Sequence, residues 1–306
     1  MKTITLGISN LAVPVIAIGC MRINGVDRKT AEAFVKTALD LGANFFDHAD
    51  CYGNGECESI FADAIGMNGA VREKILLQSK CGIVPGKMFD FSKGHILKAA
   101  DGILKRLKTD YLDVLLLHRP DALVEPEEVA EAFDSLYSSG KVRNFGVSNQ
   151  DPYLIQLLRR SVKQPIVVNQ LQLSITNATL ITQTMNMNMV DDMAVDRDNG
   201  TLNFCRLNSI TVQPWSPFQY GFFQGTFIGN EKFQKLNAKL GEIAGRYHVS
   251  AVTIALAWLL RHPAKFQPVT GTMNAARLGE CVKAADITLS REEWYEIFLA
   301  AGHRLP

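Results

Sequence analysis

Four polar side chains, each at the end of an apolar run or just beyond one, could act together on a substrate: Asp47, Tyr52, Lys80 and His118. Asp47 and Tyr52 lie in one segment, in which an apolar run gives way abruptly to polar residues and glycines. Lys80 and His118 each follow one of the next two apolar runs. Such runs are typical of buried strands, and catalytic groups in barrels and open α/β folds collect at the carboxyl ends of strands. We therefore expect the four side chains to share one site.

The chemistry that this set permits is proton donation by a phenol. A free tyrosine has a pKa of about 10, too high for easy proton transfer at neutral pH, and a nearby ammonium lowers it by stabilising the phenolate. A lysine after a buried strand is costly unless an acid pairs with it, so Asp47 is expected to hold Lys80 in its charged form. Tyr52 could then act as a general acid while His118 orients a substrate oxygen.

Each of these residues also has a structural interpretation when it is taken alone. Asp47 could cap a turn, Tyr52 could lie at a barrel rim, and His118 could be a satisfied hydrogen-bonding group. Their occurrence together at successive strand ends favours catalysis. The sequence has no HExxH or GxSxG motif and no cluster of His and Cys ligands, so no metal ion is predicted. A phenolic acid without a metal suits the reduction of a carbonyl group, provided that a hydride comes from elsewhere.

The composition excludes several other classes of function. Apolar residues make up 47% of the chain and charged residues 21%, as in ordinary globular proteins. Lys plus Arg number 32 against 31 for Asp plus Glu, so no overall charge favours nucleic acid or a membrane surface as a partner. The six cysteines are scattered without a CxxC motif, which favours reduced thiols and a cytoplasmic protein. The longest apolar stretches are too short to span a bilayer.

The elements that must position the four residues follow a regular rhythm of apolar runs and helical patterns. A small hairpin is expected over 2–13, and the first helix runs from Arg28 to Leu41. Ser92 can cap a further helix, and 177–200 is interpreted as a long irregular connection. The pattern predicts one (β/α)8 TIM barrel over residues 1–306, with a metal-dependent hydrolase or isomerase as an alternative function. The eight expected strands are 15–18, 43–47, 75–79, 112–117, 142–146, 166–169, 209–213 and 267–270.

The motif Asp47-xxxx-Tyr52-Gly53-xx-Glu56, with Lys80 and His118, resembles the catalytic tetrad of the aldo-keto reductases. The resemblance covers essentially the whole chain and is strongest to the bacterial YdhF-like oxidoreductases. It implies an NADPH-dependent enzyme that reduces an aldehyde or ketone, with NADH also possible. A catalytically slow NADP(H)-binding sensor of the same fold is the alternative, as in the potassium-channel β subunits of this family.

The resemblance also implies a cofactor site on the barrel loops, which explains why no GxGxxG fingerprint is present. One segment would bind the nicotinamide carboxamide, a second would stack on the nicotinamide ring, and a third would hold the adenosine end. The implied residues are Gly19, Met21, Arg22, Asp47, Ser148, Asn149, Gln170, Trp215, Ser216, Pro217, Phe218, Gly271, Thr272, Met273, Arg277 and Glu280.

One departure from the family concerns the phosphate ligands. Many members have a lysine where Gly271 stands, so a preference for NADPH rests mainly on Arg277 and Thr272 here. The predicted partner is a small-molecule carbonyl substrate, but its identity, the direction of the reaction and the oligomeric state are not predicted. The residues expected to shape the substrate pocket are mixed aromatic and cationic ones: Met21, Arg22, Phe89, Arg119, Phe218, Tyr220, Phe222 and Phe223.

Overall fold

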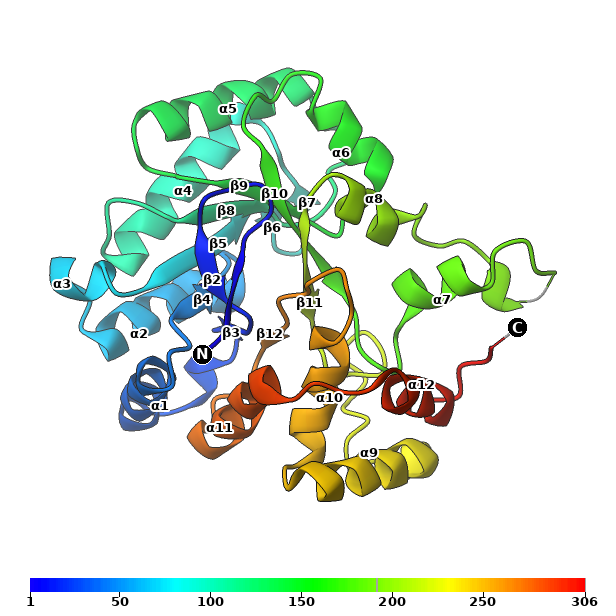
Figure 1. Cartoon of the computed structure of the whole chain (residues 1–306). Coiled ribbons are helices and arrows are strands. Elements are labelled where there is room, and N and C mark those ends of the chain that lie inside the picture. Colours follow the sequence, from blue (N-terminus) through cyan, green and yellow to red (C-terminus); the bar gives the residue numbers. More distant parts are fainter. Residues whose placement is uncertain (191, 306) are drawn as a thin grey trace.

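The computed structural model describes residues 1–190 and 192–305, and its centre is a closed barrel of eight parallel strands (Figure 1). Neighbouring strands follow the order β10-β11-β12-β3-β4-β5-β8-β9 around the barrel. This confirms the predicted (β/α)8 architecture. The barrel strands are β3 (Ala17–Gly19), β4 (Phe45–Asp47), β5 (Leu76–Cys81), β8 (Val114–Leu117), β9 (Phe145–Ser148), β10 (Ile166–Gln172), β11 (Thr211–Trp215) and β12 (Val269–Thr270).

Helices surround the barrel on its outer side, as Figure 1 shows. The α-helices are α1 (Arg28–Asp40), α2 (Glu56–Ile65), α3 (Gly69–Arg72), α4 (Lys93–Leu107), α5 (Pro126–Ser138), α6 (Pro152–Leu158), α7 (Thr179–Met185), α8 (Thr201–Leu207), α9 (Gln234–Tyr247), α10 (Ala251–Leu260), α11 (Ala275–Lys283) and α12 (Arg291–Ala300). Short 3-10 helices are η1 (Ile23–Gly25), η2 (Tyr52–Gly55), η3 (Asp192–Ala194), η4 (Glu231–Phe233) and η5 (Ala284–Asp286).

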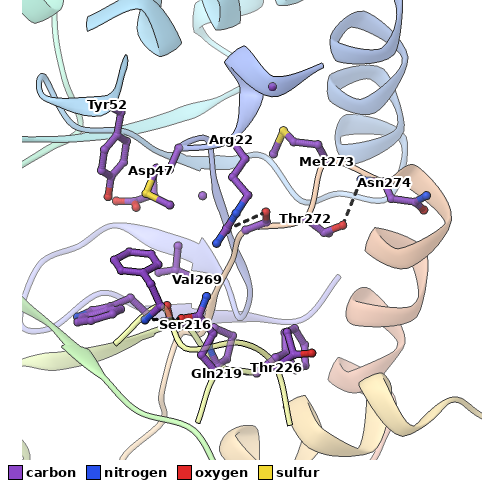
Figure 2. Close-up of a pocket in the computed structure, with 18 of the residues that line it drawn as sticks. Arg22, Asp47, Tyr52, Ser216, Gln219, Thr226, Val269, Thr272, Met273 and Asn274 are labelled. Atoms are coloured by element: carbon purple, nitrogen blue, oxygen red, sulfur yellow. Dashed lines mark hydrogen bonds between the residues drawn. The ribbon is translucent and has the colours of Figure 1, made fainter. Parts of the chain in front are cut away.

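The predicted N-terminal hairpin is confirmed and covers one end of the barrel. β1 (Thr3–Thr5) pairs antiparallel with β2 (Ala12–Pro14). Leu6 and Val13 from this hairpin are buried in one cluster with residues of the barrel strands, among them Ala17 and Phe45. The hairpin therefore closes the amino end of the barrel, whereas the carboxyl ends of the strands border the pocket shown in Figure 2.

The helix boundaries follow the capping signals in the sequence. The Ser92 side chain accepts a hydrogen bond from the His95 N–H and begins α4. Pro126 occupies the first turn of α5, where its missing N–H costs nothing. The interpretation of 177–200 as a long irregular connection is wrong in part, because α7 lies within it. This helix spans only 7 residues and carries three threonines and an isoleucine, so its periodicity is weak.

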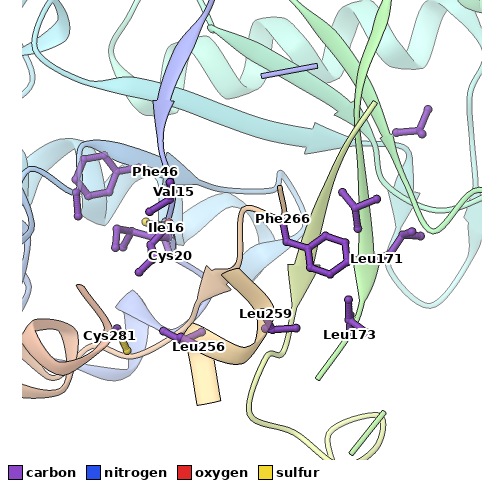
Figure 3. Close-up of a cluster of buried hydrophobic side chains, with 14 of the residues drawn as sticks. Val15, Ile16, Cys20, Phe46, Leu171, Leu173, Leu256, Leu259, Phe266 and Cys281 are labelled. Carbon is purple, nitrogen blue, oxygen red and sulfur yellow. Dashed lines mark hydrogen bonds between the residues drawn. The ribbon is translucent and has the colours of Figure 1, made fainter. Parts of the chain in front are cut away.

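The largest apolar cluster lies between the barrel and its helices. Figure 3 shows part of it, where Leu256 and Leu259 of α10 lie beside the barrel near Phe266. α10 is buried along nearly its whole length. Among the described residues, no single helix is long and apolar enough to cross a membrane. A bent pair, residues 231–247 with α10, passes on length and composition alone, with an angle of 91° between its halves.

Candidate active site

The ammonium group of Lys80 is the centre of the site. Its Nζ is fully buried and donates hydrogen bonds to Asp47 Oδ2 at 2.8 Å, to the His48 carbonyl at 2.8 Å and to Tyr52 Oη at 3.3 Å. Parallel pairing of β4 with β5 brings these residues together, because Asp47 lies opposite Gln78 in the ladder. All three N–H bonds of the ammonium thus have a partner, and one of the partners is the phenol.

Burial and the charge of the partner group shift the pKa in opposite directions, both at Lys80 and at Tyr52. Burial disfavours the charged ammonium, but Asp47 and Tyr52 outweigh it and raise the pKa of Lys80. Burial raises the pKa of the Tyr52 phenol, and Lys80 lowers it by a smaller amount. The expected lowering by the ammonium is present, but burial outweighs it, and the pKa of Tyr52 is raised overall. Tyr52 holds its proton at neutral pH, and Lys80 only offsets part of the effect of burial.

His118 lies beside the phenol at the end of β8. The two rings meet edge to face, with 5.9 Å between their centroids. Burial lowers the pKa of His118 well below its usual value, and the charges of Lys80 and Arg119 lower it further. The Nδ1 atom lies 3.6 Å from Cys51 Sγ. His118 is therefore a neutral imidazole at pH 7, able to donate one N–H to a bound oxygen.

A row of buried glutamines fixes the orientation of Asp47, and the sequence analysis missed it. Gln78 Nε2 donates to Asp47 Oδ1 at 2.6 Å, and Gln170 Nε2 donates to the same oxygen at 3.1 Å. Gln213 Oε1 accepts from both amides, at 2.8 and 3.0 Å, and Gln213 Nε2 donates to Gln267 at 2.7 Å. The available signal was a glutamine within each of the buried strands β5, β10 and β11, since a buried polar group must find a partner.

Next to Lys80 and Asp47 lies a second buried polar cluster that the sequence analysis did not assign. Glu58 accepts hydrogen bonds from Ser79 Oγ and Arg106 Nε, both at 2.7 Å. Burial and the nearby Glu58 raise the pKa of Asp50 to about 7. Burial also lowers the pKa of His48 to about 3, and neither ring nitrogen has a hydrogen-bond partner among the described residues.

A cavity of about 1490 Å³ opens over these groups at the carboxyl ends of the strands. Figure 2 shows Tyr52 and Asp47 together on one wall, with Arg22 reaching toward the segment of Thr272. Lys80 lies behind this wall. All but one of the residues predicted to bind a cofactor line the cavity, namely Gly19, Met21, Arg22, Asp47, Ser148, Asn149, Gln170, Trp215, Ser216, Pro217, Phe218, Gly271, Thr272, Met273 and Arg277.

The remaining predicted residues are placed elsewhere. Glu280 does not line the cavity, and its carboxylate is paired with Lys283 at 2.6 Å. Phe89 belongs to the outlying hairpin of β6 (Ile83–Val84) and β7 (Met88–Phe89), and Tyr220 packs on Phe233. The cavity does contain the other expected pocket residues, including Arg119, Phe222 and Phe223, and it adds Ile83, which the sequence analysis did not single out.

Asn149 organises the part of the cavity lining that contains Ser148 and Trp215. Its backbone has a φ of 57°, a left-handed conformation that asparagine tolerates better than most residues. Its Nδ2 donates to Ser148 Oγ at 2.7 Å, and its Oδ1 accepts from the indole Nε1 of Trp215 at 3.0 Å. Ser148 in turn donates to the Gln170 carbonyl at 2.9 Å. These bonds hold Trp215 at the mouth of the cavity.

The cavity carries an excess of positive charge. Its described lining includes Arg22, Arg119 and Arg277 but only one acidic side chain, Asp47, which already pairs with Lys80. Arg22 Nη1 donates to the Gly271 carbonyl at 3.3 Å, and a Cβ atom at position 271 would lie 2.5 Å from that nitrogen. Arg22 therefore occupies the space that a longer side chain at position 271 would enter.

Comparison with known proteins places this fold and site in a family. The sequence profile of the Aldo/keto reductase family matches residues 15–298. The chain is 34% identical to the uncharacterized oxidoreductase YcsN of Bacillus subtilis over 303 residues, covering 94% of each protein. It is 34% identical to a 6-dehydroglucose reductase of Agrobacterium fabrum, with 94% of this chain and 93% of that protein covered. It is 32% identical to the oxidoreductase YdhF of Escherichia coli, with 90% and 88% covered.

Solved structures give the same result. The thermostable aldo-keto reductase Tm1743, determined with the inhibitor epalrestat, matches with a TM-score of 0.78 and 27% identity over 98% of this chain and all of that one. An aldo-keto reductase from Klebsiella pneumoniae, in complex with NADPH, shares the fold with a TM-score of 0.78 at 24% identity, over 100% of this chain and 96% of that one. The chain belongs to the aldo/keto reductase family, as its motifs predict.

Proposed function

We propose that this protein is an oxidoreductase that uses NADPH to reduce an aldehyde or ketone to an alcohol, with Tyr52 as the proton donor. The observation that carries the proposal is the Lys80 ammonium, which bridges Asp47 and the Tyr52 hydroxyl beside a large cationic cavity. Family membership supports it, and so does the name 6-dehydroglucose reductase among the relatives, since that substrate is a carbonyl compound. The cytoplasmic location stays a prediction.

The residues of the cavity fit a dinucleotide phosphate. Its volume of about 1490 Å³ exceeds the range of about 300–1,000 Å³ that is usual for a site holding one small ligand. Arg22 and Arg277 are cations suited to the phosphates, and Thr272 also lines the cavity. Ser148 and Asn149 would face the carboxamide, with the adjacent indole of Trp215 to cover the ring. When bound, NADPH supplies the hydride.

Side chains of the protein then supply the proton and bind the substrate oxygen. Tyr52 is protonated at neutral pH and can give its proton to that oxygen, while neutral His118 donates an N–H to the same atom. The positive charge of Lys80 stabilises the phenolate that forms, and it therefore acts only as the proton leaves. Asp47, fixed by two glutamine amides, keeps the ammonium in place.

Replacement of Tyr52 by phenylalanine tests this role. We expect Tyr52→Phe to lower kcat for NADPH-dependent reduction of 4-nitrobenzaldehyde roughly 10²–10⁴-fold, the usual contribution of a positioned acid. The dissociation constant for NADPH, measured by calorimetry, should change by less than about twofold. Tyr220→Phe is the matched control, because Tyr220 lies outside the cavity lining. Unchanged turnover in Tyr52→Phe would rule out the phenol as the acid.

The same measurements separate the slow sensor from the enzyme. Tight NADPH binding by the wild-type protein with no turnover of any aldehyde or ketone would favour the sensor. A comparison of NADPH with NADH tests the arginines: loss of Arg277 should weaken NADPH more than NADH if its guanidinium contacts the additional phosphate. Arg22→Gln tests whether the cation next to Gly271 takes over the role of the missing lysine.

A further inference from the structure

Arg119 is a cation at the catalytic end of the cavity that lacks a carboxylate partner. It follows His118 directly at the end of β8, and it lines the cavity. Its guanidinium carbon lies 5.6 Å from the ring centre of Trp215 and 5.8 Å from that of Phe222. The side chain is half-buried, yet it makes no hydrogen bond or ion pair with any residue in the described part of the chain. Two aromatic rings therefore lie beside a guanidinium whose N–H groups have no acceptor within residues 1–190 and 192–305.

Two other buried cations of this protein have carboxylate partners. Lys80 pairs with Asp47 at 2.8 Å, and Arg72 pairs with Asp113 at 2.7 Å. Taking a charge out of water without a partner is unfavourable, and the chain provides carboxylates at both of those positions. At Arg119 it provides aromatic faces instead, which attract the cation but leave its hydrogen-bonding capacity free. That free capacity suits a ligand.

The position of Arg119 associates it with the substrate and not with the phosphates of the cofactor. Arg22 bonds to Gly271 and Arg277 lies on α11, so both stand on the β12 side of the cavity. Arg119 instead lies close enough to Tyr52 and His118 to interact with them electrostatically. It is therefore next to the groups that would hold the reacting oxygen.

The loop after β11 adds an apolar wall beside this arginine. The Tyr220 N–H donates to the Gly225 carbonyl at 3.2 Å, which closes a tight turn with Phe222 and Phe223 near its tip. The two rings are 61% and 52% exposed and lie 6.1 and 6.5 Å from the ring of Trp215. Exposed aromatic side chains that border a cavity commonly cover the apolar body of a ligand.

We propose that the substrate is an aldehyde or ketone that carries an oxyanion, a carboxylate, sulfonate or phosphate, and that the Arg119 guanidinium binds this group. The fork of N–H donors suits two oxygens of one oxyanion, and Trp215 and Phe222 cover the part of the substrate between anion and carbonyl. This inference rests on the proposed function, because it specifies the substrate of the same site.

The test compares charged and neutral aldehydes of nearly equal shape. The probes are 4-carboxybenzaldehyde, 4-formylbenzenesulfonate and the neutral 4-formylbenzamide, each reduced with NADPH. We expect the wild-type protein to favour at least one anion over the amide by about tenfold or more in kcat/KM, as a charge-assisted bidentate contact allows. In Arg119→Met the ratio should fall to about one, and in Arg119→Lys it should be intermediate. Arg160→Met removes an exposed charge elsewhere and should leave the ratio as it is.

The outcomes distinguish this inference from the function on which it rests. If none of the three aldehydes is reduced, the proposed function itself fails. If all three are reduced equally well by the wild-type protein, only the oxyanion site is overturned. Equal losses on anionic and neutral aldehydes in Arg119→Met would also overturn it. So would a large loss of NADPH affinity in that variant, measured by calorimetry, because Arg119 would then belong to the cofactor site.

Discussion

Two buried ion pairs lie at opposite ends of the barrel and differ in their other contacts. Lys80 and Asp47 meet at the carboxyl ends of β5 and β4, with a distance of 2.8 Å between charged atoms. Arg72 and Asp113 meet before the amino ends of β5 and β8, at 2.7 Å. The side chains of both pairs are at most 6% exposed. Burial and pairing alone therefore do not distinguish a catalytic charge from a structural one.

The difference lies in where the remaining hydrogen bonds go. Arg72 also donates to the carbonyls of Ile75 and Tyr111 and to Thr109 Oγ1, and Asp113 accepts from the Leu77 N–H. Every one of these partners is a fixed part of the fold. Lys80 directs one N–H to the Tyr52 hydroxyl, and Tyr52 lines the cavity. A buried charge becomes available for chemistry when one of its partners faces a ligand.

Loss of the catalytic ammonium should have the largest effect. Lys80→Met is expected to lower kcat for aldehyde reduction by roughly 10²–10⁴-fold, because nothing then offsets the effect of burial on the Tyr52 phenolate. It should also reduce the free energy of unfolding, since Asp47 loses its counter-charge. Steady-state kinetics and urea unfolding measure the two effects. Lys74→Met, at an exposed position before the same strand, is the control. Turnover close to wild type would place the catalytic charge elsewhere.

Loss of the ion pair between Arg72 and Asp113 should lower the stability of the protein without lowering its activity. We expect Arg72→Met to lower the free energy of unfolding by about 3–5 kcal/mol, because the buried Asp113 carboxylate then keeps only the more distant, exposed Arg143 as a counter-charge. The kcat of the protein that stays folded should change by less than about twofold. Arg143→Met gives a graded control, since Arg143 is 55% exposed and lies 3.5 Å from the same carboxylate. A fall in kcat as large as that of Lys80→Met would contradict the comparison.

A smaller effect is expected from Asp50, which lies behind the catalytic pair. Its pKa is about 7 in the folded protein, above that of an unfolded aspartate at about 4. Folding thus favours the protonated form of Asp50. The resulting contribution to the free energy of unfolding is largest below about pH 4 and is lost as the pH rises to about 7. Between about pH 5.5 and pH 8, the wild-type protein should lose about 1–2 kcal/mol of unfolding free energy through the ionisation of Asp50. Asp50→Asn should not show this loss.

Urea unfolding of Asp50→Asn and wild type at the two pH values measures this difference. Asp110→Asn, at an exposed position, is the control for a general change of charge. If the pH dependence of stability is the same in Asp50→Asn as in the wild-type protein, Asp50 does not titrate in this range.

The local pattern of the sequence was sufficient for the barrel and for the four groups at its carboxyl end. A strand leaves its mark as a short apolar run, and the first polar residue after the run marks the strand end. Asp47 and His118 each stand at such a point, whereas Lys80 follows two other polar residues, Gln78 and Ser79, within β5. Their meeting then follows from one assumption, that consecutive parallel strands are neighbours, which holds here for β4, β5 and β8.

The partners of these groups could not be read from the sequence, because they come from distant strands. Gln213 is separated from Gln78 by 135 positions, and they bond only because the barrel closes and faces both side chains inward. Partial burial beside the cavity raises the pKa of Tyr52, although the neighbouring Lys80 acts to lower it. The closure of the barrel also leaves Arg119 among aromatic rings without an acid. The sequence determined which groups stand at the strand ends, since that depends on neighbouring residues. Only the tertiary structure decided their burial, their partners and hence their charge, since these depend on residues far apart in the chain.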